Sequence, residues 1–584
     1  MEEPSTWAHV LGQAAYHFTQ MRPMIPTYAH LLASALFPIY AGAHASLTRP
    51  SSAARRTKQE GRKREGDQED EEVDEEEEEE HKMEGLAPTD AILMPLFAGC
   101  ALAGLYFLLK WLKDPHYLNL ALNWYFAIFG VFAVSHLITD SLDIGHSILY
   151  PRRFARGGAL YHLDQKQKRA MPVAGDTKDK APLPSPLPGF LSYIPLSERF
   201  ESMLWADRGM PGNKWTLRLY VHRLFAGKVL LGPHGMVGAL VSFAAWAYFN
   251  FVDKPWYLTN LIGFGFSYAA LQLMSPTTFT TGSLILSALF FYDIYFVFFT
   301  PMMVTVAKSI DAPIKLVFPR PGAAGSVSDK PQYAMLGLGD VVLPGIMIGL
   351  ALRFDLFVFY LRRQTRTQST DESSDVVEKP KYFSLAGRWS DHFWSHSFLG
   401  RPLWSTHTRK PEPPFTFPKT YFKASLTGYI LGMLATLGVM HIWGHAQPAL
   451  LYLVPGVLGS LWLTALVRGE LSLMWNFSEE FEDEDESKKK ADDKDTQTNA
   501  PERESIFSLS DKKAQRREDR MKKAVGKHVI ADPEEEGNGK PTDKVSAVAA
   551  HKSKREVFSF SIEAPWDLKH PRSLMESRNR PKVD

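Results

Sequence analysis

Several apolar runs of about 20 residues contain almost no charged side chains, and this feature constrains the fold most. A helix of about 20 residues crosses the hydrocarbon core of a bilayer. The overall charge balance of +1 hides the pattern, because the 66 basic and 65 acidic residues gather between and beyond the runs. The sequence therefore predicts an all-α polytopic membrane protein rather than a series of soluble domains.

About nine transmembrane helices are expected. The runs are joined by short connections, except for long polar segments after spans one, three and seven and beyond span nine. The expected spans are 25–47, 91–109, 117–138, 235–251, 257–273, 280–306, 333–352, 421–442 and 448–466.

These spans divide the chain into eight parts. Segments of low hydrophobicity and clustered charge, such as the acidic run 69–80, cannot bury a core and are expected to be disordered and dispensable for the chemistry. The parts are an N-terminal segment with the first span (1–50), a disordered charged loop (51–89), spans two and three (90–138), a cytosolic insertion (139–232), spans four to seven (233–352), a second cytosolic insertion (353–419), spans eight and nine (420–470) and a disordered charged cytosolic tail (471–584).

With nine spans, the long polar segments after spans one, three, seven and nine all lie on one side of the membrane. Basic residues near the span ends on that side, including Arg152, Arg153, Arg362 and Arg363, favour a cytoplasmic location for it. Basic residues between 308 and 320 on the other side make the bias modest. The predicted topology has a lumenal N-terminus and a cytosolic C-terminus.

Asp293 lies in the middle of the sixth apolar run, where a bare charge is expensive and is therefore a functional-site hypothesis with a partner to be found. Asp340, in the next run, is the candidate partner. If the two spans are antiparallel neighbours, the helical rise places both carboxylates roughly 18 to 20 Å from the same membrane face. The two side chains can therefore meet.

Two carboxylates at close range in a low dielectric can share one proton. The ionised member can activate a water molecule for attack on a peptide carbonyl, while the protonated member donates to the carbonyl oxygen. The sequence does not assign these two roles. The same placement of charge also suits a membrane transporter or ion pathway, and a non-catalytic adaptor that binds membrane helices for degradation is a third alternative.

The chemistry of a carboxylate pair needs no metal and no cofactor, and none is expected. The lone cysteine, Cys100, lies within an apolar run. It excludes an intrachain disulfide and a cysteine-rich metal site.

Residues beside the two aspartates are candidates for shaping the site. Gly337 and Gly339 flank Leu338 just before Asp340, where they can let a substrate backbone approach or let the helix open locally, although glycine also serves close helix packing. Tyr292 can pack, hydrogen-bond the carboxylate pair or wall the substrate pocket.

Three short motifs carry a family resemblance. Pro448-Ala449-Leu450 alone indicates only the start of a helix. Along the chain, Tyr292-Asp293, Gly337-Leu338-Gly339-Asp340 and Pro448-Ala449-Leu450 follow one another. In this order they resemble the YD, GxGD and PAL motifs of the intramembrane aspartyl proteases. Longer stretches are more similar to the signal peptide peptidase branch than to presenilin: 303–308, 312–319, 335–345 and 445–455.

The resemblance implies a presenilin-like fold and an aspartic endopeptidase in the endoplasmic reticulum membrane. Its substrates would be signal peptides and transmembrane helices of type II orientation. The implied partners are these membrane-embedded substrates and the lipid bilayer, with a second copy of the chain or a degradation complex left open, and no nucleic acid. By the same resemblance, Pro448, Ala449 and Leu450 lie close to the aspartates, where they would shape the site or hold an extended substrate.

Overall fold

The computed structural model describes two compact units. They are Met1–Trp205 with Val237–Phe481, and Ala206–Met236 with Glu482–Asp584. The acidic run 69–80 and most of the tail lie outside the described residues, so the expected disorder there stays a prediction. The described residues are 19, 22–54, 83–112, 116–165, 167–176, 180–221, 225–310, 315–319, 333–367, 376–383, 389–397, 400–405, 416–443, 447–479 and 558–563.

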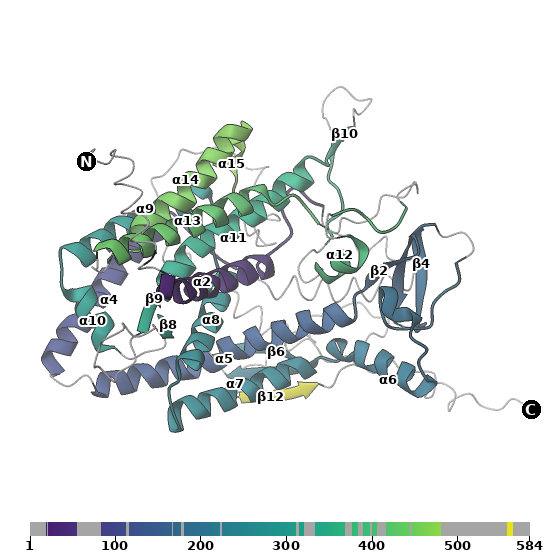
Figure 1. Cartoon of the computed structure of the whole chain (residues 1–584), viewed down its shortest axis with the longest axis horizontal. Coiled ribbons are helices and arrows are strands. Elements are labelled where there is room, and N and C mark those ends of the chain that lie inside the picture. The colour runs from purple at the N-terminus through teal and green to yellow at the C-terminus, as the bar shows by residue number, and fades with distance from the viewer. Residues whose placement is uncertain are drawn as a thin grey trace, which may run out of the picture. The chain divides into compact units, whose positions relative to one another are not determined.

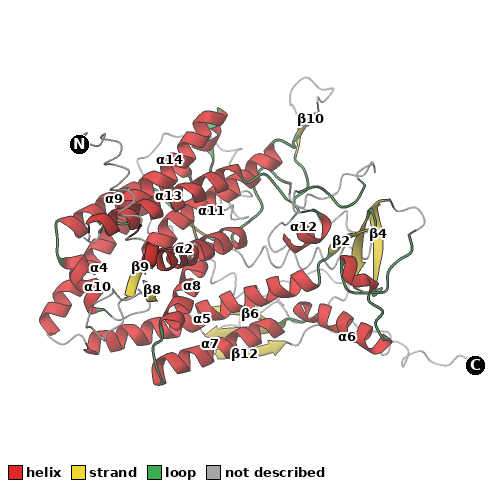
Figure 2. Cartoon of the chain, viewed as in Figure 1, coloured by secondary structure: helices red, strands yellow, loops and turns green. Residues whose placement is uncertain are grey.

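Long helices occupy all nine expected spans, which confirms the all-α polytopic fold class (Figures 1 and 2). Seven are long and apolar enough to cross a membrane; α7 and α8 have the length but are not among the seven. The helices are α2 (Ile25–Ala45), α4 (Asp90–Leu112), α5 (His116–Leu149), α7 (Pro233–Phe251), α8 (Trp256–Leu273), α9 (Phe279–Phe298), α11 (Leu338–Leu361), α13 (Thr420–Trp443) and α14 (Leu450–Arg468).

Small sheets and short helices join the long helices of the first unit. The parallel pair β1 (Glu84–Leu86) and β7 (Met274–Pro276) and three antiparallel sheets are formed by the described residues. The antiparallel strands are β2 (Arg153–Arg156), β3 (Ala159–Asp164), β4 (Arg169–Gly175), β8 (Lys315–Pro319), β9 (Tyr333–Gly337), β10 (Thr365–Thr367) and β11 (Val376–Glu378); the short helices are α6 (Glu198–Arg208), α10 (Met302–Ser309), α12 (Trp389–Ser395) and α15 (Leu471–Asn476).

The sixth and seventh spans differ from the expected boundaries. The sixth was expected to reach Val306, but α9 ends at Phe298, and α10 starts after Pro301. The seventh was expected over 333–352, but its first five residues form β9 and α11 continues to Leu361. An apolar run alone does not distinguish strand from helix, and β9 is held by its pairing with β8.

The expectation that 139–232 is a disordered insertion was wrong for its described residues. Helix α5 continues past the expected end to Leu149, and the chain then forms the β2–β3–β4 sheet. Phe154 stacks on Tyr161 with ring centroids 5.5 Å apart, and Trp205 is buried in the same small cluster. These apolar residues bury enough surface for a local core despite the polar composition around them.

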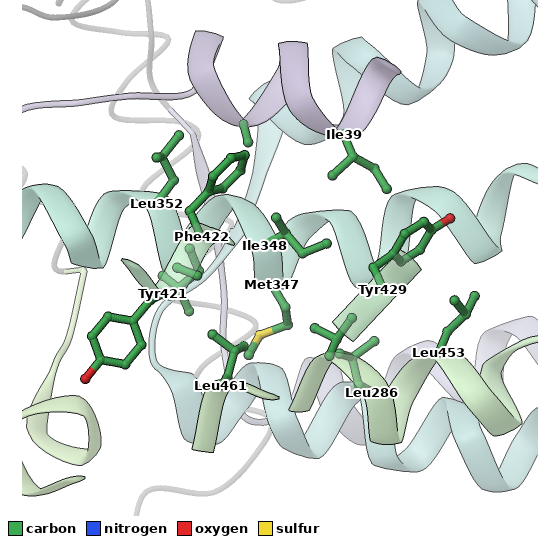
Figure 3. Packing of buried hydrophobic residues seen from close by; sticks show 14 of the residues in the cluster. Ile39, Leu286, Met347, Ile348, Leu352, Tyr421, Phe422, Tyr429, Leu453 and Leu461 are labelled. Atoms are coloured by element: carbon green, nitrogen blue, oxygen red, sulfur yellow. The ribbon is translucent and has the colours of Figure 1, made fainter. Parts of the chain in front are cut away.

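Helix α11 lies at the centre of the main hydrophobic core and is the most buried of the candidate spans. Figure 3 shows Met347 and Ile348 of this helix among side chains from four others. Ile39 comes from α2, Leu286 from α9, Tyr429 from α13 and Leu453 from α14. The helix that carries Asp340 is thus packed on several sides by other spans.

Helices α13 and α14 approach closely through glycines. A Cβ atom on Gly428 would lie 2.2 Å from the carbonyl oxygen of Gly456, and one on Gly432 would lie 2.7 Å from that of Tyr452. Only a residue without a side chain fits at such positions, as is common where membrane helices pack tightly. This contact joins the two helices that follow the second insertion.

The polar segments after α2, α5 and α14 each contact the C-terminal half of α11 or the segment that follows it. Ser52 donates to the carbonyl oxygen of Phe357 (2.9 Å), and the amide of Arg152 donates to Asp391 (2.9 Å). Arg353 of α11 pairs with Glu479, which follows α14. These contacts agree with the parity argument that puts the four long segments on one side of the membrane.

The described residues of the second unit include an antiparallel sheet in the order β12-β5-β6. It consists of β5 (Trp215–Val221), β6 (Phe225–Leu231) and β12 (Phe558–Glu563). The tail from residue 471 onward was expected to be disordered. This expectation was wrong for residues 471–479, which form α15 and the short segment after it, and for residues 558–563, which form β12. Pairing with partners distant in sequence fixes these residues, and local composition does not reveal such partners.

Candidate active site

Asp293 lies on α9, five residues before the end of the helix, with only 3% of its surface exposed. The helix start is fixed by Thr278, whose hydroxyl oxygen accepts a hydrogen bond from the amide of Thr281 (3.0 Å). The carboxylate of Asp293 accepts a hydrogen bond from the backbone amide of Leu450 at the start of α14 (3.1 Å). The structure thus joins the sixth and ninth spans at this carboxylate.

Asp340 lies in the first turn of α11 and is half-buried. Its carboxylate is close enough to that of Asp293 for direct electrostatic interaction. The rings of Phe279 and Phe354 pack with centroids 5.2 Å apart, and each aspartate lies fourteen residues from this contact along its own helix. Fourteen helical residues rise about 21 Å on both helices, so the two carboxylates come to one level.

The residues before Asp340 form the junction between β9 and α11. Gly337 is extended (φ −67°, ψ 141°) and exposed, and a Cβ atom on it would lie 3.4 Å from an Asp340 carboxylate oxygen. Leu338 packs against the main core, and its side chain lies beside Gly263 of α8. Gly339 is exposed, and its nearest contact for an added Cβ would be Leu343 at 4.0 Å. Close helix packing therefore does not explain Gly339.

Tyr292 lies beside Asp293 on α9, with its ring 4.6 Å from that of Phe296. A Cβ atom on Gly99 of α4 would lie 3.7 Å from the Tyr292 ring. The Tyr292 side chain therefore extends from α9 and packs against α4. This position suits a wall of the site.

The Pro448-Ala449-Leu450 stretch starts α14 beside Asp293. Pro448 and Leu450 are buried, and Ala449 is half-buried in helical conformation. The carbonyl oxygens of Pro448 and Ala449 accept the first helical hydrogen bonds, from Leu451 and Tyr452. Since an amide in the first helical turn has no partner within its helix, the Leu450 N–H is available to Asp293.

One residue near the pair was missed in the sequence. Tyr429 of α13 is completely buried, and its hydroxyl group donates to the backbone carbonyl oxygen of Asp340 (3.4 Å). A single tyrosine in an apolar run is common, so nothing in the sequence marks it. The arrangement brings Asp293, Asp340 and Leu450 together from three spans. The side chain of Leu338 instead lies beside α8, and the ring of Tyr292 lies beside α4.

Among the described residues, no group of three or more His, Cys, Asp or Glu side chains is arranged to hold a metal ion. The expectation that the site works without metal or cofactor stays a prediction. Cys100 is exposed on α4 and is not bonded to another cysteine.

Comparison with known proteins finds one family along most of the chain. The family model for signal peptide peptidase matches residues 77–171 and 187–481. The chain is 29% identical to signal peptide peptidase of Homo sapiens over 401 residues, which cover 68% of this chain and 74% of the relative. It is 37% identical to intramembrane protease 2 of Caenorhabditis elegans over 42% of this chain and 43% of the relative, and 33% identical to a probable intramembrane protease of Schizosaccharomyces pombe over 44% and 68%.

Proposed function

Because this chain belongs to the signal peptide peptidase family and is an intramembrane protease, we propose that Asp293 and Asp340 are its catalytic residues and make it an aspartic endopeptidase. The observation that carries this proposal is the meeting of three spans at one carboxylate pair. Asp293 accepts the Leu450 amide, and Asp340 lies within electrostatic range of Asp293. Paired carboxylates in an apolar surrounding are the groups that aspartic proteolysis requires.

Hydrolysis at this pair needs one ionised and one protonated carboxylate. The oxygen of a water molecule bonds to the scissile carbonyl carbon, the ionised carboxylate takes the water proton, and the protonated one gives its proton to the carbonyl oxygen. When the tetrahedral intermediate collapses, the C–N bond breaks and the first carboxylate protonates the leaving amine. The second carboxylate recovers its proton from the intermediate, so the pair returns to its starting state.

We assign the role of base to Asp293 and the role of proton donor to Asp340. A backbone N–H at a helix N-terminus carries partial positive charge and stabilises an anion. Asp340 lies in the first turn of its own helix, but the N–H aimed at the pair is that of Leu450, and it contacts Asp293. This favours the ionised form at Asp293 and leaves the shared proton to Asp340.

We propose that the substrates are signal peptides, as the name of the relatives from Homo sapiens and Mus musculus suggests. From the motif resemblance we extend the proposal to type II transmembrane helices and to the endoplasmic reticulum membrane. A helical substrate must unwind before its amides are accessible. The strand β9 leads within three residues to Asp340. Asn260 of α8 already hydrogen-bonds the backbone N–H and carbonyl oxygen of Val317 on β8, so an unwound segment would add to the two-stranded sheet at β9. Exposed Gly339 leaves space for the substrate backbone.

The proposed function is tested with purified protein reconstituted into liposomes containing a radiolabelled signal peptide. We expect cleavage by the wild type and none by Asp293→Asn or Asp340→Asn, each of which keeps the shape of the side chain and removes its acid–base chemistry. Cleavage by either variant at the wild-type rate would contradict the catalytic pair. Absence of cleavage by the wild type would favour a transporter or an adaptor.

The proposed orientation has the N-terminus in the lumen and the tail in the cytosol. Engineered glycosylation sequons test it in microsomes. We expect a sequon between 320 and 330 to receive sugar and sequons in the 353–419 segment and the tail to remain bare. The reverse pattern of glycosylation would show that the orientation is the opposite of the proposed one.

A further inference from the structure

The chain after the last span returns to the helices that carry the aspartates. Gly469, with φ +68°, ends α14: its backbone N–H donates a hydrogen bond to the carbonyl oxygen of Leu466, and the N–H of Glu470 donates to that of Ala465. Helix α15 follows, and the amide of Glu479 donates to the carbonyl oxygen of Thr277, just before α9 (2.8 Å). Residues 471–479 are called the C-terminal strap below; α15 is labelled in Figure 1.

The strap packs on the contact between α9 and α11. Phe477 is buried, and its ring centroid lies 5.8 Å from that of Phe279 on α9 and 5.1 Å from that of Phe354 on α11. It also lies 5.0 Å from the Phe357 ring. Phe477 therefore packs against both rings of the Phe279–Phe354 contact. Asp293 and Asp340 each lie fourteen residues from this contact along their own helices.

A buried ion pair fastens the strap. Arg353 of α11 is 4% exposed and donates to Glu479 (2.6 Å), Ser46 (2.8 Å) and Ser275 (2.5 Å). The hydroxyl group of Ser275 donates to the second oxygen of the Glu479 carboxylate (2.8 Å). The guanidinium group is thus satisfied by the end of α2, by β7 and by the strap. Loss of one partner would leave a charge buried without compensation.

We propose that the C-terminal strap sets the alignment of α9 against α11, and that Glu479 is a positioning residue for the Asp293–Asp340 pair. The inference rests on the proposed function, because it assigns the effect to the two aspartates. A shift at the base of two packed helices is carried along both as rigid elements, and a small misplacement of reacting groups has a large effect on rate. We therefore expect cleavage to need residues 471–479 and to proceed without the chain after Phe481.

The central test is Glu479→Gln, which keeps the size of the side chain and removes its charge. We expect kcat for signal-peptide cleavage to fall about tenfold or more with little change in KM, because alignment and not substrate binding is lost. Glu480→Gln removes the same charge one residue later and is the matched control, with wild-type kcat. Wild-type kcat in Glu479→Gln would overturn the proposal.

Truncations define the boundary. A chain ending at Phe481 should keep its kcat, and one ending at Asn476, which lacks Phe477 and Glu479, should lose it. Equal activity of the two truncated chains would also overturn the proposal.

Crosslinking in the membrane measures the alignment of α9 with α11 without relying on proteolytic activity. Asp293→Cys and Asp340→Cys are combined with Cys100→Ser, which removes the chain's only native cysteine. Short bifunctional thiol reagents should join the two positions several-fold more slowly when Glu479→Gln is added. An unchanged rate would contradict the positioning role even if Glu479→Gln were inactive through instability. Activity in Asp293→Asn would instead refute the proposed function and leave this crosslinking result standing.

Discussion

Two buried carboxylates in this protein meet the N-terminus of a neighbouring helix, with different consequences. Asp293 accepts the amide of Leu450 at the start of α14. Asp355 of α11, 5% exposed, accepts the amides of Tyr421 (3.1 Å) and Phe422 (2.9 Å) at the start of α13. Successive backbone amides at the start of α13 donate to Asp355, whereas Asp293 accepts the Leu450 amide and shares its surroundings with a second carboxylate. Burial of an acid is therefore common to both, and the paired charge is what distinguishes the candidate active site.

Hydrogen bonds and ion pairs surround Glu470, which is linked to the Asp355 region through Tyr421. Glu470 accepts hydrogen bonds from Tyr421 (2.7 Å) and Arg468 (3.2 Å) and pairs with Arg362. Burial alone would raise the pKa of Glu470, but the Tyr421 hydroxyl group and the two arginines outweigh it and hold the pKa below its usual value. Charges there stabilise helix ends. At the N-terminal end of α11, Asp340 lies near Asp293 of α9. Two neighbouring carboxyl groups are suited to sharing a proton and binding a water molecule.

The largest predicted effect is the loss of cleavage when Asp293 or Asp340 is replaced by asparagine, with Asp355→Asn as the comparison. Asp293→Asn and Asp340→Asn should lower cleavage at least about a thousandfold with an unchanged melting temperature, since acid–base chemistry is lost and shape is kept. Asp355→Asn should keep most activity and lower stability by about 1 kcal/mol, because an amide oxygen caps a helix less well than a carboxylate. Liposome cleavage and thermal unfolding measure the two quantities. A folded but inactive Asp355→Asn protein would place Asp355 in the catalytic machinery.

A second contrast concerns glycines at the site and in the helix packing. Gly339→Ala adds a methyl group to open space, so stability should be unchanged or slightly higher, while cleavage should fall about tenfold through obstruction of the substrate. Gly428→Ala would meet the Gly456 carbonyl oxygen at 2.2 Å and should lower stability by about 1 to 3 kcal/mol. Thermal unfolding alongside kcat/KM separates the two effects. Full activity in Gly339→Ala would show that the backbone there is not approached by substrate.

The sequence predicted the nine helices and the meeting of Asp293 with Asp340, because long uncharged runs and isolated charges are local signals. It placed a span boundary at Arg353, since a charge is usually found at the membrane surface. The structure shows that α11 continues because Arg353 is neutralised by Glu479, 126 residues later in the chain. Partners that distant leave no trace in local hydropathy.

The same reason explains the other corrections. The apolar residues 333–337 suited either a strand or a helix, and pairing with β8 decided for the strand. Phe477 and Glu479 lie where the chain becomes highly charged, so composition placed them in a disordered tail. Their contacts with Phe354 and Arg353 of α11 fix them instead.

A third prediction tests whether the Leu450 amide sets the charge of the pair. Leu450→Pro removes the N–H at a position where helices tolerate proline, and Leu450→Ala keeps the N–H as a matched control for the lost side chain. If Asp293 is the base, losing its donor makes proton release harder, so the acidic limb of the kcat/KM profile should move up by about one pH unit in Leu450→Pro only. Movement of the alkaline limb instead would exchange the two roles. No movement would show that the amide does not support the ionised carboxylate.

The smallest predicted effect is at Glu470, with its hydrogen bonds and ion pairs. Because its pKa is lower in the folded protein than in the unfolded chain, Glu470 contributes stability at neutral pH that is lost as pH falls through the folded pKa. Glu470→Gln should therefore lower stability by about 1 kcal/mol at pH 7, with the difference from wild type shrinking below about pH 4.5. Thermal unfolding in detergent across this range measures it, and cleavage at pH 7 should stay near wild type. A large loss of cleavage at unchanged stability would contradict the division between a structural and a catalytic end of α11, because a charge that only secures helix ends should affect rate no more than it affects folding.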